Sequence, residues 1–564
     1  MTIFAGIKSL NDAEVNPNFR DEINTLMNEY CNNENIQQFG YTMCHLWSYD
    51  IGAFSAQVSE KSDSKLTIVA GEPILKARDN NAGVVSDIAL INKTNDDDNL
   101  SLLLQSARGT FSGVIYKSES NKLSVFTDKS GIRPVYYFSI GSMFVFCSSL
   151  QLINKLSFSP KEINKEALNE HMAMGYCFSN KTPHKSIFRL DAAEILTSYN
   201  GVVRNCFYWN WDAIGETSES EVDKVAALYD VFNESIDCRL NTSNEQFAFL
   251  SGGLDSRVIT ASVNEKSPMI HTFNFATEGS QDSVFANLLA ENAKYQHEPQ
   301  ILPTLKYQRW NNLIAKVISK KFDMNEHCFV WSGDGGSVGL GGVYMDESII
   351  SYIERGDMDN AALLFLNNQK ASLLTSYLNK DFQFLSDQVL QKSITKELID
   401  NKGSGARQLY SFLMKNDQKR HLDQHFETIN EHKVELLLPF FDSLFLEKIL
   451  NCNIERLMKH SLYMEWFEQF PIKYRETPWQ TYPDHIPCPI PYKKVISQWQ
   501  NRDGFSNRWR DFKRFLELYK SGFSFEVYNR KKVTIAMFLH LLGVKKAGYV
   551  IDSVSRVNNI DVNK

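Results

Sequence analysis

The sequence predicts an α/β protein with three parts: an antiparallel β-sandwich with helices, then a doubly wound parallel sheet, then a helical extension. Three observations support this prediction. Short apolar or alternating runs separated by turn residues fill the first 200 or so positions. A strand–helix–strand pattern starts near residue 246. Helical periods dominate from about residue 360 onward.

The N-terminal part contains four runs of strand character joined by turn chemistry. The runs lie at 113–117, 123–127, 135–138 and 143–147. Polar residues of the types favoured in turns separate them. An aromatic cluster followed by a polar stretch then ends this region, so we place the first domain at 1–212.

The second part begins with an apolar run at 246–250 that leads into a glycine turn. Helical character follows at 255–263, and another apolar run occupies 270–275. Strand, helix and strand at this spacing indicate parallel strands of one sheet. We place the second domain at 222–495 and the helical extension at 496–564.

Composition excludes several classes of protein. The 564 residues carry a net charge of −7, so no overall basic field attracts nucleic acid. The nine cysteines form no C-x-x-C pair and are odd in number, which argues against a zinc knuckle or a secreted disulfide framework. No signal-peptide pattern and no run of about 20 apolar residues is present, so we expect a cytoplasmic protein without a membrane partner.

The glycine turn at 251–256 is the strongest functional signal. It reads Ser251, Gly252, Gly253, Leu254, Asp255, Ser256. Glycines allow backbone N–H groups to approach an anion closely, and the N-terminus of the following helix adds donors and a positive dipole end. The two serine hydroxyls suit phosphate oxygens, and the aspartate suits the Mg²⁺ that accompanies ATP. The alternative is an ordinary glycine turn capped by serine and aspartate.

This hexapeptide resembles the pyrophosphate loop of N-type ATP pyrophosphatases, and four further stretches resemble the asparagine synthetase family in the same order. The resemblance covers roughly residues 3–490 and implies that Phe273, Phe275 and Gly333 lie near ATP. It also implies a glutaminase-like N-terminal domain. The four stretches are 128–137, which reads D-K-S-G-I-R-P-V-Y-Y; 273–282; 332–342, which reads S-G-D-G-G-S-V-G-L-G-G; and 435–442, which reads E-L-L-L-P-F-F-D.

The sequence departs from the family at the glutamine nucleophile. Glutamine-hydrolysing members carry a cysteine in a stretch M-C-G-I, whereas this chain has Ala5 there. Alanine cannot form a thioester. The family's arginine–glycine and S-D-T-E pieces also lack a clear match between residues 40 and 100. We therefore expect a disarmed domain like that of β-lactam synthetases and lasso-peptide cyclases.

A second departure lies in the loop at 332–342, where Ser337 and Val338 replace the family's D-E pair. The family's aspartate there joins the one matched by Asp255 in holding Mg²⁺. Serine is a weaker ligand and valine is none, although one carboxylate plus phosphate oxygens is acceptable for Mg²⁺. Asp334 is a nearby carboxylate whose position in the family serves the substrate side.

The resemblance also suggests residues for the second half of the reaction. Glu435 is a candidate to orient the attacking amine or accept its proton, or else a structural carboxylate paired with a cation. Lys473, in preference to Arg475, is a candidate to stabilise the oxyanion, or else a solvated surface lysine.

Three functions remain open at this point. One is a glutamine-independent ligase that adenylates a small-molecule or peptide carboxylate with ATP and Mg²⁺. Another is an asparagine synthase-like enzyme that uses ammonia, and the third is a non-catalytic ATP-binding protein, which the residues at 337 and 338 favour. Basic runs at 415–421 and 508–514 are either exposed helix faces or a docking surface for a peptide or carrier-protein partner.

Overall fold

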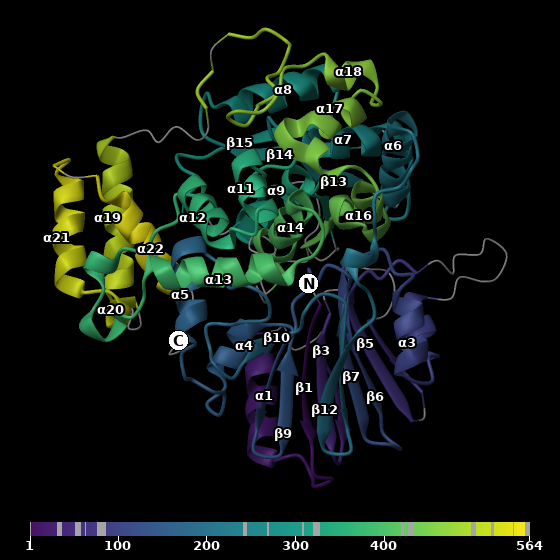
Figure 1. The fold of residues 1–564 in the computed structure, drawn as a ribbon. Helices are drawn as coiled ribbons and strands as arrows, with labels where there is room; N and C mark the ends of the chain where they lie inside the picture. The colour runs from purple at the N-terminus through teal and green to yellow at the C-terminus, as the bar shows by residue number, and fades with distance from the viewer. Residues whose placement is uncertain are drawn as a thin grey trace. The chain divides into compact units, whose positions relative to one another are not determined.

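Figure 1 shows the computed structural model of the chain. The structure describes a large share of the residues, and every structural statement below refers to these. The described ranges are 2–30, 36–50, 58–62, 64–75, 86–240, 245–267, 270–306, 310–319, 328–418, 422, 425–426, 434–493, 495–497, 504–520, 524–544 and 546–558.

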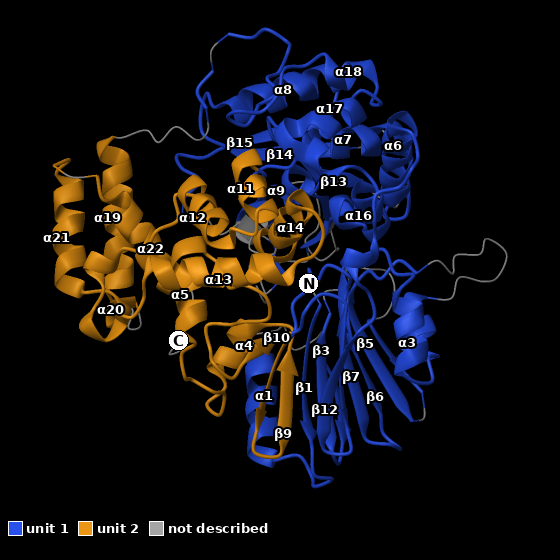
Figure 2. Cartoon of the chain, viewed as in Figure 1, with its two compact units in different colours: residues 1–135, 190–345, 421–500 blue, residues 136–189, 346–420, 501–564 orange. Residues whose placement is uncertain are grey.

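The chain divides into two compact units, each assembled from three stretches (Figure 2). Unit 1 comprises residues 1–135, 190–345 and 421–500, and unit 2 comprises residues 136–189, 346–420 and 501–564. The domains predicted at 1–212, 222–495 and 496–564 are continuous stretches of sequence, whereas the two units group residues by their contacts. The predicted domains therefore stay a prediction.

The N-terminal part of unit 1 is built from antiparallel sheets. One sheet has six strands in the order β12-β11-β7-β6-β5-β4, and in the other β3 pairs antiparallel with both β1 and β2. Lys8 of β1 donates a hydrogen bond to Ser198 of β11 at 3.1 Å, which ties the two layers together. The bounds are β1 (Ile3–Ser9), β2 (Ile36–Tyr41), β3 (Cys44–Tyr49), β4 (Ser59–Lys61), β5 (Lys65–Gly71), β6 (Phe111–Lys117), β7 (Lys122–Thr127), β11 (Glu194–Tyr199) and β12 (Val202–Phe207).

Two short helices cover one face of the large sheet. They are α2 (Asp87–Asn92) and α3 (Asp97–Leu104), capped by Ser86 and Asp96. Their apolar sides join Phe111 and Phe126 of the strands in one buried cluster. Helix α1 (Pro17–Tyr30) lies beside β3.

The second half of unit 1 is a five-stranded parallel sheet in the order β15-β14-β13-β16-β17. Numbered along the chain, this order is 3-2-1-4-5, so the direction of winding reverses between β13 and β16. Helices α7 and α8 connect the first strands. The bounds are β13 (Gln246–Phe249), β14 (Ile270–Ala276), β15 (Gln296–Ile301), β16 (Cys328–Trp331), β17 (Val434–Leu437), α7 (Asp255–Lys266) and α8 (Gln281–Ala293).

Further helices of unit 1 surround this sheet. Ser220 caps the long helix α6 by accepting the N–H of Asp223, and Phe232 on its buried face packs against Phe440 and Trp466. The remaining bounds are α6 (Glu221–Asp237), α9 (Trp310–Ile318), α10 (Gly336–Gly339), α16 (Ser443–Leu450), α17 (Ser461–Phe467) and α18 (Ile472–Arg475).

Unit 2 is mainly helical. Its strands β8, β9 and β10 form antiparallel pairs, and its last four helices make up the C-terminal extension. The bounds are β8 (Tyr136–Ile140), β9 (Met143–Cys147), β10 (Phe188–Arg189), α4 (Leu150–Lys155), α5 (Lys165–Met174), α11 (Glu347–Glu354), α12 (Met358–Asn368), α13 (Asp387–Asp400), α14 (Gly405–Phe412), α19 (Phe505–Tyr519), α20 (Ser524–Val527), α21 (Arg530–Leu541) and α22 (Gly548–Asn558).

The predicted fold class is confirmed: antiparallel sheets form the N-terminal region and a parallel sheet follows. Within the described ranges, no helix has both the length and the apolar character needed to span a bilayer.

Candidate functional site

Two loops meet at the reversal point of the parallel sheet. Residues 251–254 leave β13, residues 332–335 leave β16, and these two strands are parallel neighbours with Phe247 opposite Val330. In open α/β sheets, ligands bind outside the carboxyl ends of the strands at such a switch point. The topology therefore places the glycine turn where a ligand is expected.

The glycine turn after β13 closes on itself through its serines. The Ser251 N–H donates to Ser256 Oγ at 2.8 Å, and the two hydroxyl oxygens lie 2.9 Å apart. A Cβ on Gly252 would lie 2.7 Å from the Gln281 carbonyl oxygen, so no side chain fits there. A Cβ on Gly253 would meet only Ser251 Oγ at 3.4 Å, so this glycine borders open space.

Helix α7 begins directly after this turn. No side chain caps its N-terminus, where Leu254 is the N-cap residue. The first N–H groups of a helix lack partners within the helix and attract anions. The open space beside Gly253 and the uncapped helix end together form a cradle suited to phosphate.

Asp255, the first residue of α7, is enclosed by the loop that follows β16. A Cβ on Gly336 would lie 2.6 Å from the Asp255 carboxylate, and one on Gly333 would lie 2.8 Å from the Ser256 nitrogen. The hydroxyl of Ser337 donates to Asp255 Oδ2. The loop at 332–342 thus depends on glycine to approach the first turn of α7.

Burial raises the pKa of Asp255 to about 6, and the neighbouring charge of Asp334 contributes in the same direction. The hydroxyls of Ser337 and Tyr463 counteract this only in part. Asp334 itself accepts a hydrogen bond from Ser332 Oγ at 2.5 Å. A cation beside Asp255 would favour its ionised form.

Asp282 supplies a second carboxylate from α8. Its Oδ1 accepts the Gly252 N–H at 2.8 Å, and burial raises its pKa. The stretch at 273–282, which resembles the family, therefore contacts the glycine turn through Asp282. Phe273 and Phe275 themselves lie on β14 with ring centroids 5.8 Å apart, and neither lines the cavity described next.

A cavity that is partly open to solvent lies over these loops. Its lining contains two carboxylates and, among the described residues, no lysine or arginine. The lining residues are Ser251, Gly253, Leu254, Asp255, Asp282, Ser337, His460, Met464, Trp479, Gln480, Thr481, Tyr482 and Ile486.

The far wall is a strap after α18 that is anchored to α7. Arg257 of α7 donates to the backbone carbonyls of Tyr474, Thr477 and Pro478 at 3.1, 2.5 and 2.7 Å. The Gln480 N–H donates to the Gly252 carbonyl at 2.8 Å. These hydrogen bonds fix the position of the strap, and thus of this cavity wall, relative to the glycine turn.

His460 was not singled out from the sequence, yet it lines the cavity. It and Lys459 adopt left-handed backbone angles, with φ of 66° and 57°, which are costly for residues other than glycine. Its ring stacks on Tyr482 at 5.9 Å, and its buried Nδ1 has no partner among the described atoms. Burial lowers the pKa of His460 to about 3, so the ring is neutral at pH 7. No sequence pattern marks this position, because the two unusual backbone conformations arise from tertiary packing.

Both residues predicted for the second half of the reaction lie outside the cavity lining, as do Gly252, Ser256, Gly333 and Asp334 of the surrounding loops. Glu435, on β17, is fully buried and accepts a hydrogen bond from Arg133 Nη2 at 2.8 Å. Burial opposes ionisation of this carboxyl group, but the charge of Arg133 holds the pKa of Glu435 below its usual value. Lys473, on α18, is 47% exposed and pairs with Glu265 at 2.7 Å. These contacts match the structural alternatives given above, and the catalytic assignments stay predictions.

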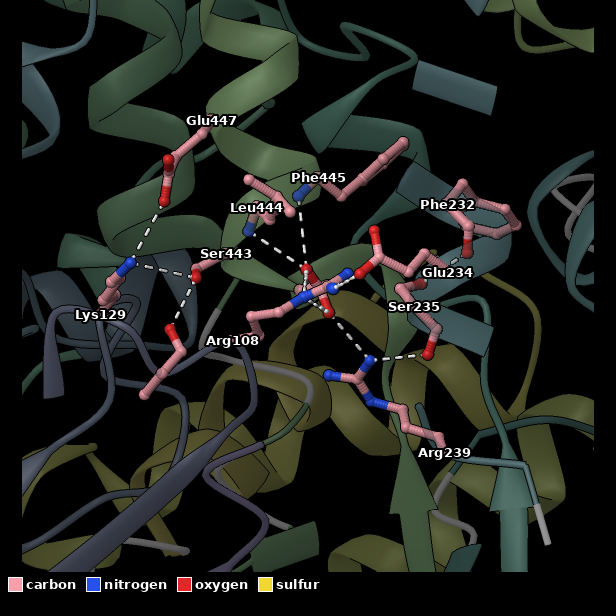
Figure 3. Close-up of polar contacts among 12 residues, drawn as sticks. Arg108, Lys129, Phe232, Glu234, Ser235, Arg239, Ser443, Leu444, Phe445 and Glu447 are labelled. Atoms are coloured by element: carbon pink, nitrogen blue, oxygen red, sulfur yellow. Dashed lines mark hydrogen bonds and ion pairs between the residues drawn. The ribbon is translucent and has the colours of Figure 1, made fainter. Parts of the chain in front are cut away.

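Arg133 and Glu435, which form one ion pair, belong to two of the matched motifs. Figure 3 shows a second set of ion pairs in unit 1. Asp442 pairs with Arg108 at 3.1 Å and with Arg239 at 3.0 Å. Lys129 pairs with Glu447 at 3.2 Å. We call these residues, with Arg133 and Glu435, the junction cluster, because they join the antiparallel part of unit 1 to its parallel-sheet part.

The residues fit Mg²⁺ bound together with a nucleotide. Among the described residues, no group of three or more His, Cys, Asp or Glu is arranged to hold a metal ion. Mg²⁺ commonly uses one or two carboxylates and completes its shell with phosphate oxygens and water. Asp255 offers a carboxylate whose ionised form needs a positive neighbour, and Asp282 lies across the same cavity.

Ala5 lies buried in β1, opposite Trp47 of β3. The nearby Cys44 on β3 is also buried, and burial raises the pKa of its thiol, which keeps it protonated. A protonated, buried thiol is not a nucleophile.

Comparison with known proteins matches both halves of unit 1. A glutamine amidotransferase domain model matches residues 98–209, and an asparagine synthase model matches residues 227–306. Asparagine synthetase [glutamine-hydrolyzing] 2 of Bacillus subtilis is 28% identical over 201 residues, 34% of this chain and 26% of that protein. Asparagine synthetase [glutamine-hydrolyzing] 3 of the same organism is 27% identical over 179 residues, 30% of this chain and 28% of that protein.

The chain matches between 26% and 38% of the length of the first curated relatives. A solved glutamine phosphoribosylpyrophosphate amidotransferase of B. subtilis aligns over 60% of this chain and 77% of its own, with 10% identity and a TM-score of 0.26, too low to support an inference. The two domain models, in this order, correspond to the antiparallel and parallel sheets of the structure. Together, these matches support membership of this chain in the asparagine synthetase family.

Proposed function

We propose that this protein is an ATP-dependent, amide-bond-forming ligase that adenylates a carboxylate and then admits an amine without hydrolysing glutamine. The observation that supports this most strongly is the phosphate cradle at the sheet reversal, bounded by Gly253, the uncapped start of α7 and the carboxylate of Asp255. An anionic ligand is attracted by the helix end, and a divalent cation is attracted by the carboxylates.

In the first half of the reaction, the cradle holds the β- and γ-phosphates of ATP. Hydroxyls of Ser251 and Ser256 and N–H groups at the start of α7 donate to phosphate oxygens. Mg²⁺ held by Asp255 and Asp282 would offset the phosphate charge. The substrate carboxylate oxygen attacks the α-phosphorus, and the bond from that phosphorus to the oxygen bridging the α- and β-phosphates breaks. Pyrophosphate departs, and the carboxylate is now an acyl-adenylate.

In the second half, an amine nitrogen attacks the acyl carbonyl and AMP leaves. The amine must lose a proton as the C–N bond forms. His460 lines the same cavity, and its Nδ1 is unpartnered among the described atoms. Burial makes the ring a weak base in the free protein, so the negative charge of the bound phosphates would have to raise its pKa for it to accept that proton. This mechanism assigns no step to Glu435 or Lys473, because both lie outside the lining.

The absence of a thiol at Ala5 and the protonated state of Cys44 support a glutamine-independent reaction. The amine then comes from the substrate or from solution. The relatives named above are described as glutamine-hydrolysing, which is the opposite expectation and makes this part of the proposal directly testable.

The test is ATP–pyrophosphate exchange and AMP release with a panel of carboxylates, each supplied with an amine, ammonium or glutamine. We expect carboxylate-dependent exchange and amine-dependent AMP release, both indifferent to glutamine. Product formation stimulated by glutamine would refute the disarmed N-terminal domain. Stimulation by ammonium alone would favour an asparagine synthase-like reaction. ATP binding without AMP under any condition would favour a non-catalytic binding protein.

A further inference from the structure

The C-terminal helices α19 and α21, both in unit 2, expose a stripe of large apolar side chains. On α19 the exposed residues recur at one face, namely Phe505, Trp509, Leu516 and Tyr519. On α21 and just after it, Ile535, Phe538 and Leu542 follow the i, i+3, i+7 spacing of one helix face and are 61%, 51% and 72% exposed.

This exposure is concentrated in one part of the chain. Of the 23 large hydrophobic residues that are exposed in the described ranges, nine lie between residues 505 and 549. Single exposed apolar residues are ordinary, whereas a contiguous set marks an interaction site.

The stripe is continuous across the two helices. The rings of Phe505 and Trp509 stack at 6.5 Å, Trp509 and Phe512 stack at 6.1 Å, and Phe512 meets Phe538 of α21 at 5.1 Å. Figure 1 draws these helices next to each other in yellow. Two neighbouring helices with adjoining apolar faces can receive a third amphipathic helix.

The charge around the stripe is opposite to that of the rest of the protein. Residues 501–564 contain 13 Lys and Arg against 6 Asp and Glu, a net charge of +7, whereas the whole chain carries −7. The first 500 residues therefore carry −14.

Two positive charges lie beside rings of the apolar stripe, and two acidic groups of α19 are paired within the region. The Lys513 ammonium lies 5.8 Å from the Trp509 ring, and Arg530 lies 4.8 Å from the Tyr519 ring. Asp511 is buried against His540 at 3.1 Å, and Glu517 pairs with Arg514 at 3.1 Å. An incoming surface meets apolar side chains bordered by cations.

We propose that this stripe, Phe505, Trp509, Leu516, Tyr519, Ile535, Phe538 and Leu542 with its flanking lysines and arginines, is the docking surface for an acidic amphipathic helix of a partner protein or peptide. Apolar residues of the partner pack on the stripe, and its carboxylates meet the basic flanks. A partner helix has a limited footprint and contacts only this basic region. An anionic bilayer is disfavoured because the chain as a whole is acidic, with a net charge of −7.

The experiment measures fluorescence anisotropy of a labelled, synthetic 20-residue helix with a Leu/Phe stripe and glutamate at its other positions, titrated with the full chain. We expect saturable binding that weakens with salt, and weak binding of a peptide of the same composition in scrambled order. Leu542→Ser should weaken binding about tenfold, because a leucine contact is lost. Leu102→Ser, a leucine on α3 that is 70% exposed, is the matched control and should leave binding unchanged. Lys513→Glu should weaken binding and flatten its salt dependence, whereas Lys402→Glu should do neither.

Several results would overturn the proposal. These are no binding of the designed helix, equal binding of the scrambled peptide, or equal weakening by Leu542→Ser and Leu102→Ser. Co-sedimentation with phosphatidylglycerol vesicles that Leu542→Ser abolishes would assign the stripe to a membrane instead. A concentration-dependent dimer in light scattering that Leu542→Ser disrupts would assign it to a second copy of the chain.

Discussion

Carboxylates occur in two different settings within unit 1. In the cavity, Asp255 and Asp282 line a space without a lysine or arginine among its described lining residues, and burial raises both pKa values. In the junction cluster, Asp442 meets two arginines and Glu435 meets Arg133, which holds the pKa of Glu435 low. Buried carboxylates that stabilise a fold are paired with cations, whereas carboxylates that line a cavity with no lysine or arginine in its described lining are suited to bind a cationic ligand.

The largest expected effect that separates the cavity carboxylates from those of the junction cluster is that of Asp255→Asn. We expect ATP–pyrophosphate exchange to fall about 10²- to 10³-fold, because a charge that favours cation and transition state is removed. The free energy of unfolding without ligand should instead rise, since the neutral amide avoids the cost that raises the Asp255 pKa. Exchange kinetics and urea denaturation measure the two effects. Unchanged exchange would remove Asp255 from the site.

Asp442→Asn should behave in the opposite way. It leaves Arg108 and Arg239 buried with one carboxylate fewer, and we expect a loss of about 3–5 kcal/mol in the free energy of unfolding. Urea denaturation measures this. Asp346→Asn is the matched control, because Asp346 also caps a helix by accepting two N–H groups but is not paired with arginine. Asparagine preserves the cap, so the control should change stability little. An equal loss in both variants would show that capping, not ion pairing, explains the effect.

His460→Gln tests the second half of the reaction. The amide can hydrogen bond but is a poor base, so amine-dependent AMP release should fall about 100-fold. Carboxylate-dependent exchange should be nearly unchanged, because that step precedes the proton transfer. A parallel loss of exchange would mean that His460 supports the cavity rather than the amine step.

The two settings also predict opposite dependences of stability on pH. A raised pKa in the folded state means that Asp255 binds its proton more tightly when folded, so its contribution to stability declines as pH rises from about 4 to 6. We expect a decline of about 1–2 kcal/mol, allowing for partial exposure. The lowered pKa of Glu435 means that its contribution is lost as pH falls through the acidic range. Denaturation of the wild type and Asp255→Asn at pH 4 to 7 should differ in slope only between pH 4 and 6.

The smallest effect is expected for Lys473→Ala. Its ion pair with Glu265 is exposed, so we expect a change in stability of about 0.5 kcal/mol or less. Exchange and AMP release should stay within about twofold, because Lys473 does not line the cavity. A large loss of AMP release with normal exchange would restore the sequence-based role of this lysine.

The local elements were predictable because each is encoded in a short stretch. The expected strands at 123–127 and 143–147 correspond to Lys122–Thr127 and Met143–Cys147. The expected helix at 255–263 corresponds to Asp255–Lys266, three residues longer. The glycine turn was recognisable for the same reason, since its glycines, serines and aspartate are consecutive.

The cavity's far wall was not predictable from its own residues. His460, Trp479 and Tyr482 carry no motif, and they reach the glycine turn only because Arg257 fastens the strap to α7. Glu435 illustrates the same limit. Its motif was recognisable, but its contact with Arg133, some 300 positions away in the sequence, was not.

The sequence by itself determined the order of the two sheets, the glycine turn after residue 250 and the alanine at position 5. These depend on periodicity, on glycine's conformational freedom and on the identity of single side chains. Tertiary structure alone decided which carboxylates meet a cation and which line an open cavity. That distinction depends on contacts between residues far apart in the chain, because packing brings Arg133 to Glu435 and Arg108 to Asp442 but brings no described cation to the lining beside Asp255.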